Sequence, residues 1–333
     1  MTPQWHHKIG NHTQIGGIET SVLDNGTARG TRIAWVNTGT GLRYKVVLDR
    51  GMDIMEAFFN QHSLAWLSHV GTVAPQPMSD TGIDWLRTFG GGLLTTCGLS
   101  NVGVPNGAHG LHGKISNTPA EIEAIVQPDV QRGSMDFSIV GTMKETTVFG
   151  PCLELRRTIS GFLGQATIHI KDEVTNRGNQ PMPLMLLYHI NFGWPLVDEG
   201  ADILWEGDWQ PRSPETTKIF KNDNNFKKCP PPLDDHLGTG EEVAFINPTA
   251  DESGECMCGI QNDALGLTVK VFFKKEQLPH LTNWQHWGKY EYVTGLEPGT
   301  NPPIGQEAAR QVNQLLMLNP LETKLFELTI TIN

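Results

Sequence analysis

The segment LYHINFGWP, residues 187–195, places a histidine directly after an apolar run. Residues 183–188 are typical of a buried strand, and the next residue is His189. An amide and two large aromatic side chains follow it: Asn191, Phe192 and Trp194. A lone histidine on an apolar strand is usually a core residue, but apolar walls with a few polar groups are typical of a small-molecule pocket. His189, Asn191 and Trp194 are therefore candidate site residues.

A carboxylate occupies a comparable position in the segment YEYVTGLEPGTNPP, residues 290–303. Glu297 follows an apolar approach and precedes Pro298, which fixes its position at the end of a predicted strand. An ordinary turn carboxylate would give the same pattern. If Glu297 is instead partly buried, its pKa can be shifted toward a value that suits a general base.

Two histidines lie three residues apart in HGLHGKISNTPAE, residues 109–121. Glycines flank His109 and His112, and this would leave both rings accessible. The pair could hydrogen-bond a polar ligand, chelate a metal together with a distant carboxylate, or belong to a structural turn. No acidic residue stands at a local ligand spacing, so we expect hydrogen bonding to a ligand and predict no metal site.

Trp85 and Arg87 precede three consecutive glycines in the segment WLRTFGGG, residues 85–92. Glycine permits close backbone approach, so this segment is either a tight loop or the wall of a ligand site. In the second case, Trp85 offers a flat apolar face and Arg87 donates hydrogen bonds to ligand hydroxyls.

These motifs together resemble the aldose 1-epimerase (galactose mutarotase-like) superfamily, and most closely a branch of uncharacterised epimerase-like proteins. LHG at 111–113 is similar to the superfamily's substrate-binding histidine motif, and LLYHINFG at 186–193 is similar to the strand that carries its catalytic histidine. GLEPGTNPP at 295–303 is similar to its Glu-Pro motif. The resemblance runs from about residue 40 to the C-terminus. It implies an all-β fold, the antiparallel β-supersandwich.

The resemblance also implies a role for each matching residue. His112 matches a sugar-contacting histidine, His189 the general acid and Glu297 the general base. Arg87 loosely matches a substrate-binding arginine, although the surrounding sequence differs from the family pattern. Further candidates for substrate binding are His109, Asn191, Trp85 and Trp194.

The implied reaction is the interconversion of sugar anomers by an isomerase that needs no cofactor. Glu297, as a carboxylate, takes the proton of the anomeric hydroxyl, and His189, as an imidazolium, protonates the ring oxygen. The ring opens, the C1–C2 bond rotates, and reclosure gives the other anomer. One alternative is an isomerase or lyase that acts on an oxidised or acidic sugar, with a metal held by the histidines. A second alternative is a carbohydrate-binding protein without catalysis.

Strands must position these residues, because alternation of apolar and polar residues recurs along the chain. It is clearest in four segments, 42–48, 166–174, 266–273 and 325–332. Residues 305–318 predict a short helical turn followed by a strand, and the polar, proline-rich residues 221–242 predict a long loop that could be functional. We expect one β-sandwich domain over residues 1–333, in which residues 1–40 form an N-terminal extension with the first strands.

Composition narrows the function classes. The net charge of −11 disfavours nucleic acid as a partner, and no run approaches the ~18 apolar residues of a membrane helix. P-loop, G-x-S-x-G and H-E-x-x-H motifs are absent. Five cysteines without paired spacing indicate free thiols, and the N-terminus lacks a signal-peptide core. We therefore expect a cytoplasmic monomer or homodimer whose partner is a small-molecule sugar.

Overall fold

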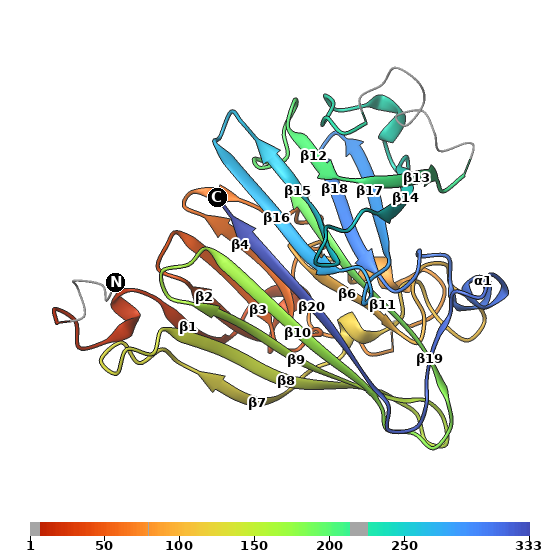
Figure 1. Ribbon diagram of the computed structural model, residues 1–333, viewed down its shortest axis with the longest axis horizontal. Coiled ribbons are helices and arrows are strands. Elements are labelled where there is room, and N and C mark those ends of the chain that lie inside the picture. Colours follow the sequence, from red (N-terminus) through yellow and green to blue (C-terminus); the bar gives the residue numbers. More distant parts are fainter. Residues whose placement is uncertain (1–6, 79, 214–225) are drawn as a thin grey trace.

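The computed structural model describes residues 7–78, 80–213 and 226–333, whose regular secondary structure is almost entirely antiparallel β-strand (Figure 1). The strands form three sheets, of eight, seven and five strands. The predicted all-β class and antiparallel β-sandwich are thus confirmed.

The eight-stranded sheet forms one layer of the sandwich. Its strands alternate buried and exposed residues, so that one face packs on the core and the other meets solvent. In spatial order they are β12 (Asp202–Trp205), β15 (Glu255–Asn262), β16 (Leu267–Lys274), β20 (Thr323–Ile332), β10 (Thr167–Asn176), β9 (Cys152–Phe162), β8 (Asp136–Thr146) and β7 (Glu121–Val126).

The seven-stranded sheet carries the site. Its order is β13 (Gly207–Pro211), β14 (Glu242–Pro248), β17 (His280–Gly288), β18 (Glu291–Gly299), β11 (Met182–Gly193) and β19 (Leu316–Leu318), with β6 (Thr95–Leu99) paired to β11. Ten consecutive residues of β11, from Leu184 to Gly193, are buried. Both faces of this strand are therefore covered, which explains why it reads as a continuous apolar run.

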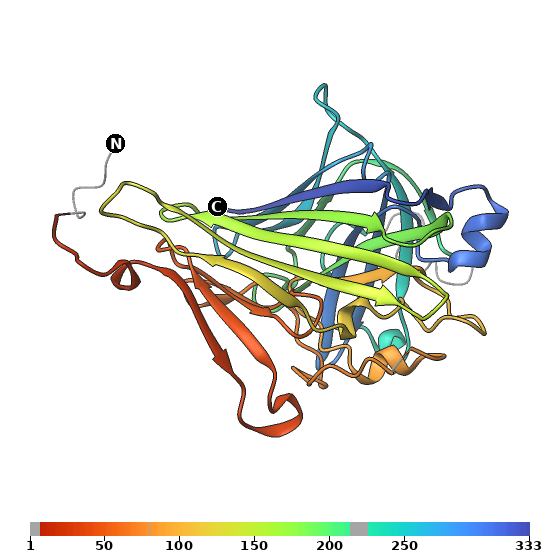
Figure 2. The same cartoon turned by 90° about the horizontal axis from the view of Figure 1, so that it is seen from below.

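The five-stranded sheet comprises the N-terminal strands β1 (Gly17–Val22), β2 (Arg32–Asn37), β3 (Leu42–Val47), β4 (Asp53–Phe59) and β5 (His62–Ser63). Figure 2 shows its red hairpin extending downward, away from the other two sheets. The first two strands lie within residues 1–40, and β2 pairs with β3, so this segment is part of the same sheet as β3–β5.

Helical structure in the described chain is short. It consists of α1 (Gln306–Gln311) and five 3₁₀ turns, η1 (His12–Gln14), η2 (Gly26–Ala28), η3 (Asp84–Arg87), η4 (Ile115–Asn117) and η5 (Asp234–His236). The predicted helical turn and strand within residues 305–318 are confirmed by α1 and β19. Among the residues that the structure describes, no helix is long and apolar enough to cross a membrane. All five cysteines are free, as the sequence predicts.

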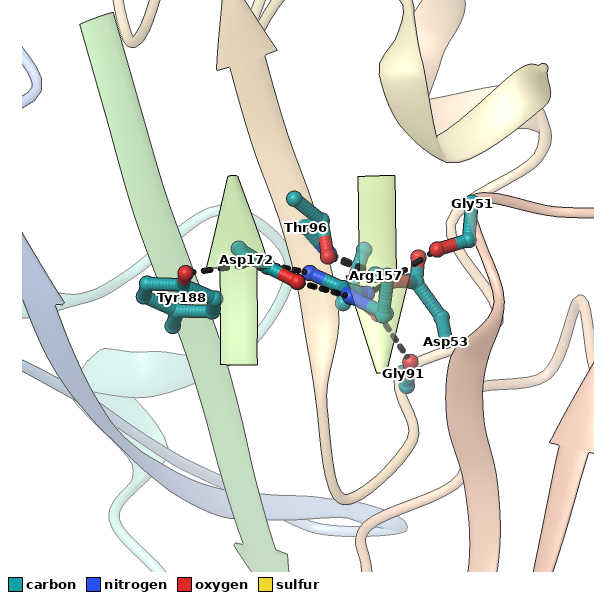
Figure 3. Close-up of polar contacts among 8 residues, drawn as sticks. Gly51, Asp53, Gly91, Thr96, Arg157, Asp172 and Tyr188 are labelled. Atoms are coloured by element: carbon teal, nitrogen blue, oxygen red, sulfur yellow. Dashed lines mark hydrogen bonds and ion pairs between the residues drawn. The ribbon is translucent and has the colours of Figure 1, made fainter. Parts of the chain in front are cut away.

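A buried ionic network crosses the core behind the site (Figure 3). Arg157 on β9 is fully buried and donates two hydrogen bonds to the carboxylate of Asp172 on β10, at 2.9 and 2.6 Å. Its third nitrogen, Nη1, lies 2.9 Å from the carbonyl oxygen of Gly51 and 3.2 Å from Asp53 of β4. A buried guanidinium requires such pairing because an unpaired charge in the core is very costly.

The same network reaches the strand that carries His189. The hydroxyl of Tyr188, on β11, donates to Asp172 at 2.7 Å, and the hydroxyl of Thr96, on β6, donates to Asp53 at 2.6 Å. Neighbouring residues of a strand point to opposite faces, so Tyr188 anchors β11 from the core while His189 faces away from it. The network therefore ties strands of all three sheets together.

Candidate active site

A cleft of about 630 Å³ opens over the face of the seven-stranded sheet that points away from the core. Such a volume is usual for small-molecule sites. One part of its lining comes from loops between residues 66 and 112, and the other from residues 189–303. The lining residues are Trp66, Trp85, Leu86, Phe89, Gly103, Val104, Leu111, His112, His189, Arg212, Gly238, Thr239, Glu241, Val243, Thr282, Trp284, His286, Glu291, Glu297 and Pro303.

His189 and Glu297 meet at the floor of this cleft. Their strands, β11 and β18, are neighbours, and the pairing of Ile190 with Leu296 sets them opposite one another across the ladder. The distance from His189 Nε2 to Glu297 Oε1 is 3.3 Å, and Oε1 has no hydrogen-bond partner among the described residues. Both side chains are buried. A sugar must therefore approach both from the same side.

Burial changes the proton affinities of this pair. It lowers the pKa of His189 to about 3, with a smaller contribution from the nearby ring of His112. It also raises the pKa of Glu297 well above its usual range, and the charge of Glu241 adds to this. Desolvation disfavours the charged form of each group. Both shifts favour the neutral forms, an imidazole at His189 and a carboxylic acid at Glu297, which is the reverse of the charged pair expected from the sequence.

His112 reaches the cleft from the loop after β6. Its backbone has φ 58°, a left-handed conformation, and its amide donates to the carbonyl oxygen of Gly103 at 3.1 Å. The ring centroid lies 5.7 Å from that of His189. Nδ1 has no hydrogen-bond partner in the described structure, and desolvation lowers the pKa of the ring to about 4. His112 thus presents a neutral imidazole beside His189.

Aromatic rings surround the two histidines. Trp85 stacks on Phe89 with centroids 4.2 Å apart and lies 4.7 Å from His112. On the opposite side Trp284 meets the edge of His189 at 5.5 Å, and Trp66 meets Trp284 at 6.0 Å. These rings supply the flat apolar area that matches the C–H face of a sugar.

Charged side chains occupy the other end of the cleft. Arg212 donates to Glu241 at 2.7 Å, and Glu241 also accepts from the indole N–H of Trp284 at 2.8 Å. His286 lies 3.7 Å from Glu291. Gly238, Thr239 and Glu241 come from the predicted long loop 221–242, of which residues 221–225 lie outside the described residues. No group of three or more histidine, cysteine or acidic residues that could hold a metal occurs within the described residues.

Comparison with known proteins places the chain in a family. A model described as a domain of unknown function (DUF4432) matches residues 28–332. The chain belongs to the DUF4432 family. No curated protein matches the sequence of this DUF4432 chain.

Solved structures share the fold of this DUF4432 chain. A putative aldose 1-epimerase from Klebsiella pneumoniae is 26% identical, with a TM-score of 0.86 over 97% of this chain and 86% of the other. A galactose mutarotase-like protein from Clostridium acetobutylicum is 13% identical, with a TM-score of 0.64 over 96% and 99%. A galactose 1-epimerase from Lactobacillus acidophilus is 12% identical, with a TM-score of 0.61 over 95% and 98%. The predicted resemblance to the aldose 1-epimerase superfamily is confirmed.

Of the predicted residues, the DUF4432 chain brings His189, Glu297, His112 and Trp85 together in the cleft. Two others point elsewhere. The side chain of Arg87 is 80% exposed and pairs with Asp84 at 3.1 Å, because the 3₁₀ turn η3 directs it outward while Trp85 points inward. Trp194 is 67% exposed and lies outside the cleft, beyond the end of β11. The structure thus places neither Arg87 nor Trp194, both predicted to bind substrate, in the cleft.

The remaining two predicted residues support the site from behind. Asn191 is fully buried and donates to the carbonyl oxygens of Gly92 and His189, each at 3.0 Å. His109 Nδ1 lies 3.3 Å from the Ser100 hydroxyl, behind the wall of the cleft. Neither of these side chains, both predicted as substrate contacts, lines the cleft. The sequence did not single out the cleft residues Trp66, Phe89, Arg212, Glu241 and Trp284. Phe89 does lie within the segment 85–92 quoted above, and Glu241 lies within the predicted long loop.

Proposed function

We propose that this protein is an aldose 1-epimerase that interconverts the anomers of a free sugar by acid–base catalysis. The observation that carries the proposal is the contact of two buried titratable groups, His189 and Glu297, on the floor of an aromatic cleft. Strongly shifted pKa values in a cleft are typical of catalytic acids and bases. The coarser statement, a carbohydrate-related epimerase fold, already follows from the solved structures.

The reaction needs one proton acceptor and one proton donor at adjacent atoms of the sugar. The anomeric hydroxyl and the ring oxygen are bonded to the same carbon, so two catalytic groups in contact can address both. Glu297 takes the proton of the anomeric hydroxyl and His189 gives a proton to the ring oxygen. The C1–O5 bond breaks, rotation about C1–C2 turns the aldehyde, and the reverse steps close the ring to the other anomer. No cofactor enters this scheme.

The neutral pair that burial favours already holds the one proton that this chemistry needs. Protonated Glu297 with neutral His189 carries the same single proton as ionised Glu297 with cationic His189. The reactive form is reached when that proton moves from the carboxyl to the imidazole, across the 3.3 Å between Oε1 and Nε2. A bound sugar promotes this transfer, because its hydroxyls replace the apolar surroundings with hydrogen-bonding partners.

The proposal is tested by NMR measurement of anomer exchange over a panel of aldoses, corrected for spontaneous exchange. Glu297→Gln removes proton acceptance, and His189→Asn removes the titrating ring. Each variant should fold, bind sugar and lose about 10²–10⁴-fold in catalysed rate. Matched controls are Glu327→Gln and His169→Asn, at solvent-facing positions of β20 and β10, and both should retain the wild-type rate. Near wild-type turnover by Glu297→Gln on an accepted substrate would disprove the mechanism.

A further inference from the structure

A glycine lies beneath the two side chains that the proposed mechanism uses. Gly295 precedes Glu297 by two residues on β18, and alternate residues of a strand point to the same face of a sheet. A Cβ atom added at Gly295 would lie 2.8 Å from Glu297 Oε1 and 3.5 Å from His189 Cε1. The carboxyl and the imidazole therefore meet over this glycine.

The backbone at this position does not require a glycine. Gly295 pairs with Asn191 of β11 on one side and with Trp284 of β17 on the other, as an ordinary interior residue of the sheet. Its φ lies outside the left-handed region that favours glycine. A glycine inside a strand weakens the strand, and it often marks a place where another group approaches closely. The reason for the glycine is therefore the space above it.

The group that approaches is the carboxyl of Glu297. Its Oε1 is buried, has no hydrogen-bond partner among the described residues, and lies 3.3 Å from His189 Nε2. A distance of 2.8 Å is too short for a methyl carbon and an oxygen that are not bonded to each other. A methyl group at residue 295 and the carboxyl in its present place thus exclude one another.

The other neighbours of this space would move little. Trp284 Cε3 would lie 3.2 Å from the added Cβ, and the indole N–H is held by Glu241 at 2.8 Å. The 3.5 Å to His189 Cε1 is an ordinary contact. The carboxyl, in contrast, ends a flexible side chain. A methyl group at residue 295 would therefore displace Oε1 by about 0.7 Å or more, the shift that restores an ordinary contact distance, without disturbing the strands.

We propose that Gly295 is a positioning residue for anomer exchange. The absence of a side chain there lets the Glu297 carboxyl lie against His189, where both groups reach adjacent oxygens of one sugar. The inference rests on the proposed function and adds a residue that touches neither substrate nor proton.

The first test needs no substrate. Crystal structures of the full-length wild type and of Gly295→Ala compare the position of the Glu297 carboxyl directly. In the variant, Oε1 should leave its place and its contact with His189 Nε2 should lengthen, while the backbone of β18 stays as it is. A contact that keeps its wild-type length would overturn the inference.

The second test measures the rate of anomer exchange by NMR. Misplacing a catalytic group by 1 Å costs up to about 10²-fold, so Gly295→Ala should lower kcat and kcat/KM together by about 10- to 100-fold, with KM little changed. A higher KM at an unchanged kcat would overturn the inference, because the glycine would then serve sugar binding by leaving room. Gly107→Ala is the control, because an added Cβ there meets no atom within 4 Å, and it should keep the wild-type rate.

A double variant covers the case in which Gly295→Ala does not fold. Adding Glu297→Asp shortens the side chain by one methylene and withdraws the carboxyl from the new methyl group. The double variant should then fold, as judged by circular dichroism. Failure of both variants to fold would overturn the inference, because the methyl group would then clash with something other than this carboxyl.

The two proposals fail in different ways. A wild-type protein that exchanges anomers, with a carboxyl that does not move in Gly295→Ala, would reject the role of Gly295 and support the epimerase. A carboxyl that moves with no loss of rate, or a wild-type protein without anomer exchange, would reject the mechanism proposed for Glu297. The crystal structures would still show that Gly295 sets the position of that carboxyl.

Discussion

Single residues at the floor of the cleft determine how activity depends on pH. Under the proposed mechanism, the pair formed by His189 and Glu297 is active while it holds one proton. As the pH falls, the pair gains a second proton near the pKa of His189, about 3. As the pH rises, it loses its remaining proton at the raised pKa of Glu297. We therefore expect kcat/KM for the free enzyme to stay level from pH 5 to 7, with its acid limb below pH 4.5. An acid limb near 6.5, the usual value for histidine, would show that His189 is solvated.

The buried carboxyl of Glu297 also affects stability. Its pKa is raised in the folded state, so above pH 4.5 the unfolded chain releases a proton that the folded chain keeps, and stability falls as the pH rises. Glu297→Gln removes the titrating group, and with it this pH-dependent loss of stability. The variant should therefore melt at a higher temperature than wild type, by a margin that grows as the pH rises above 4.5 and levels off once the folded-state carboxyl ionises. Thermal unfolding followed by circular dichroism at several pH values measures the margin, and a margin independent of pH contradicts the burial of a protonated acid.

At the scale of elements, the ionic network behind β11 makes a prediction about stability. Arg157→Met leaves Asp172 and Asp53 buried without their cation, and breaking a buried pair in this way typically costs about 3–5 kcal/mol. The adjacent Arg156 is a matched control, because it lies on the solvent face of the same strand with partly exposed partners. Arg156→Met should cost at most about 1 kcal/mol. Urea unfolding of both variants gives the comparison, and equal losses would contradict it.

The elements were far easier to predict from the sequence than the site. Alternation revealed strands such as β10 and β20, whose two faces meet different environments. His189 and Glu297 were found because a titratable residue on a buried strand needs a reason to be there. Arg87 and Arg212 show the limit. The sequence suggested Arg87, but a 3₁₀ turn directs it to solvent, and the fold brings Arg212 into the cleft from an unremarkable strand end. Such positions depend on long-range packing, which local patterns do not encode.

At the scale of the whole molecule, the net charge of −11 bears on the choice of substrate. The cleft lining includes two carboxylates, Glu241 and Glu291, and one arginine, Arg212. A sugar phosphate should therefore bind more weakly than the parent sugar at low salt. The difference in dissociation constant between the two sugars should become smaller as ionic strength rises, because the Debye length falls from ~30 Å at 0.01 M to ~10 Å at 0.1 M. Calorimetric titrations at both ionic strengths measure this. Tighter binding of the phosphate would instead favour an enzyme for acidic sugars.

Strand β20 has a consequence for how the molecule is made in the cell. It lies between β16 and β10 in the eight-stranded sheet, and it joins two groups of strands that are otherwise unconnected within that sheet (Figure 1). A ribosome synthesises residues 323–332 after all the other strands described. Until then, β16 and β10 each have one edge without its hydrogen-bonded neighbour. Unpaired edges recruit strands from other chains. Biosynthesis therefore includes an interval in which a chaperone that shields strand edges would determine the yield of folded protein.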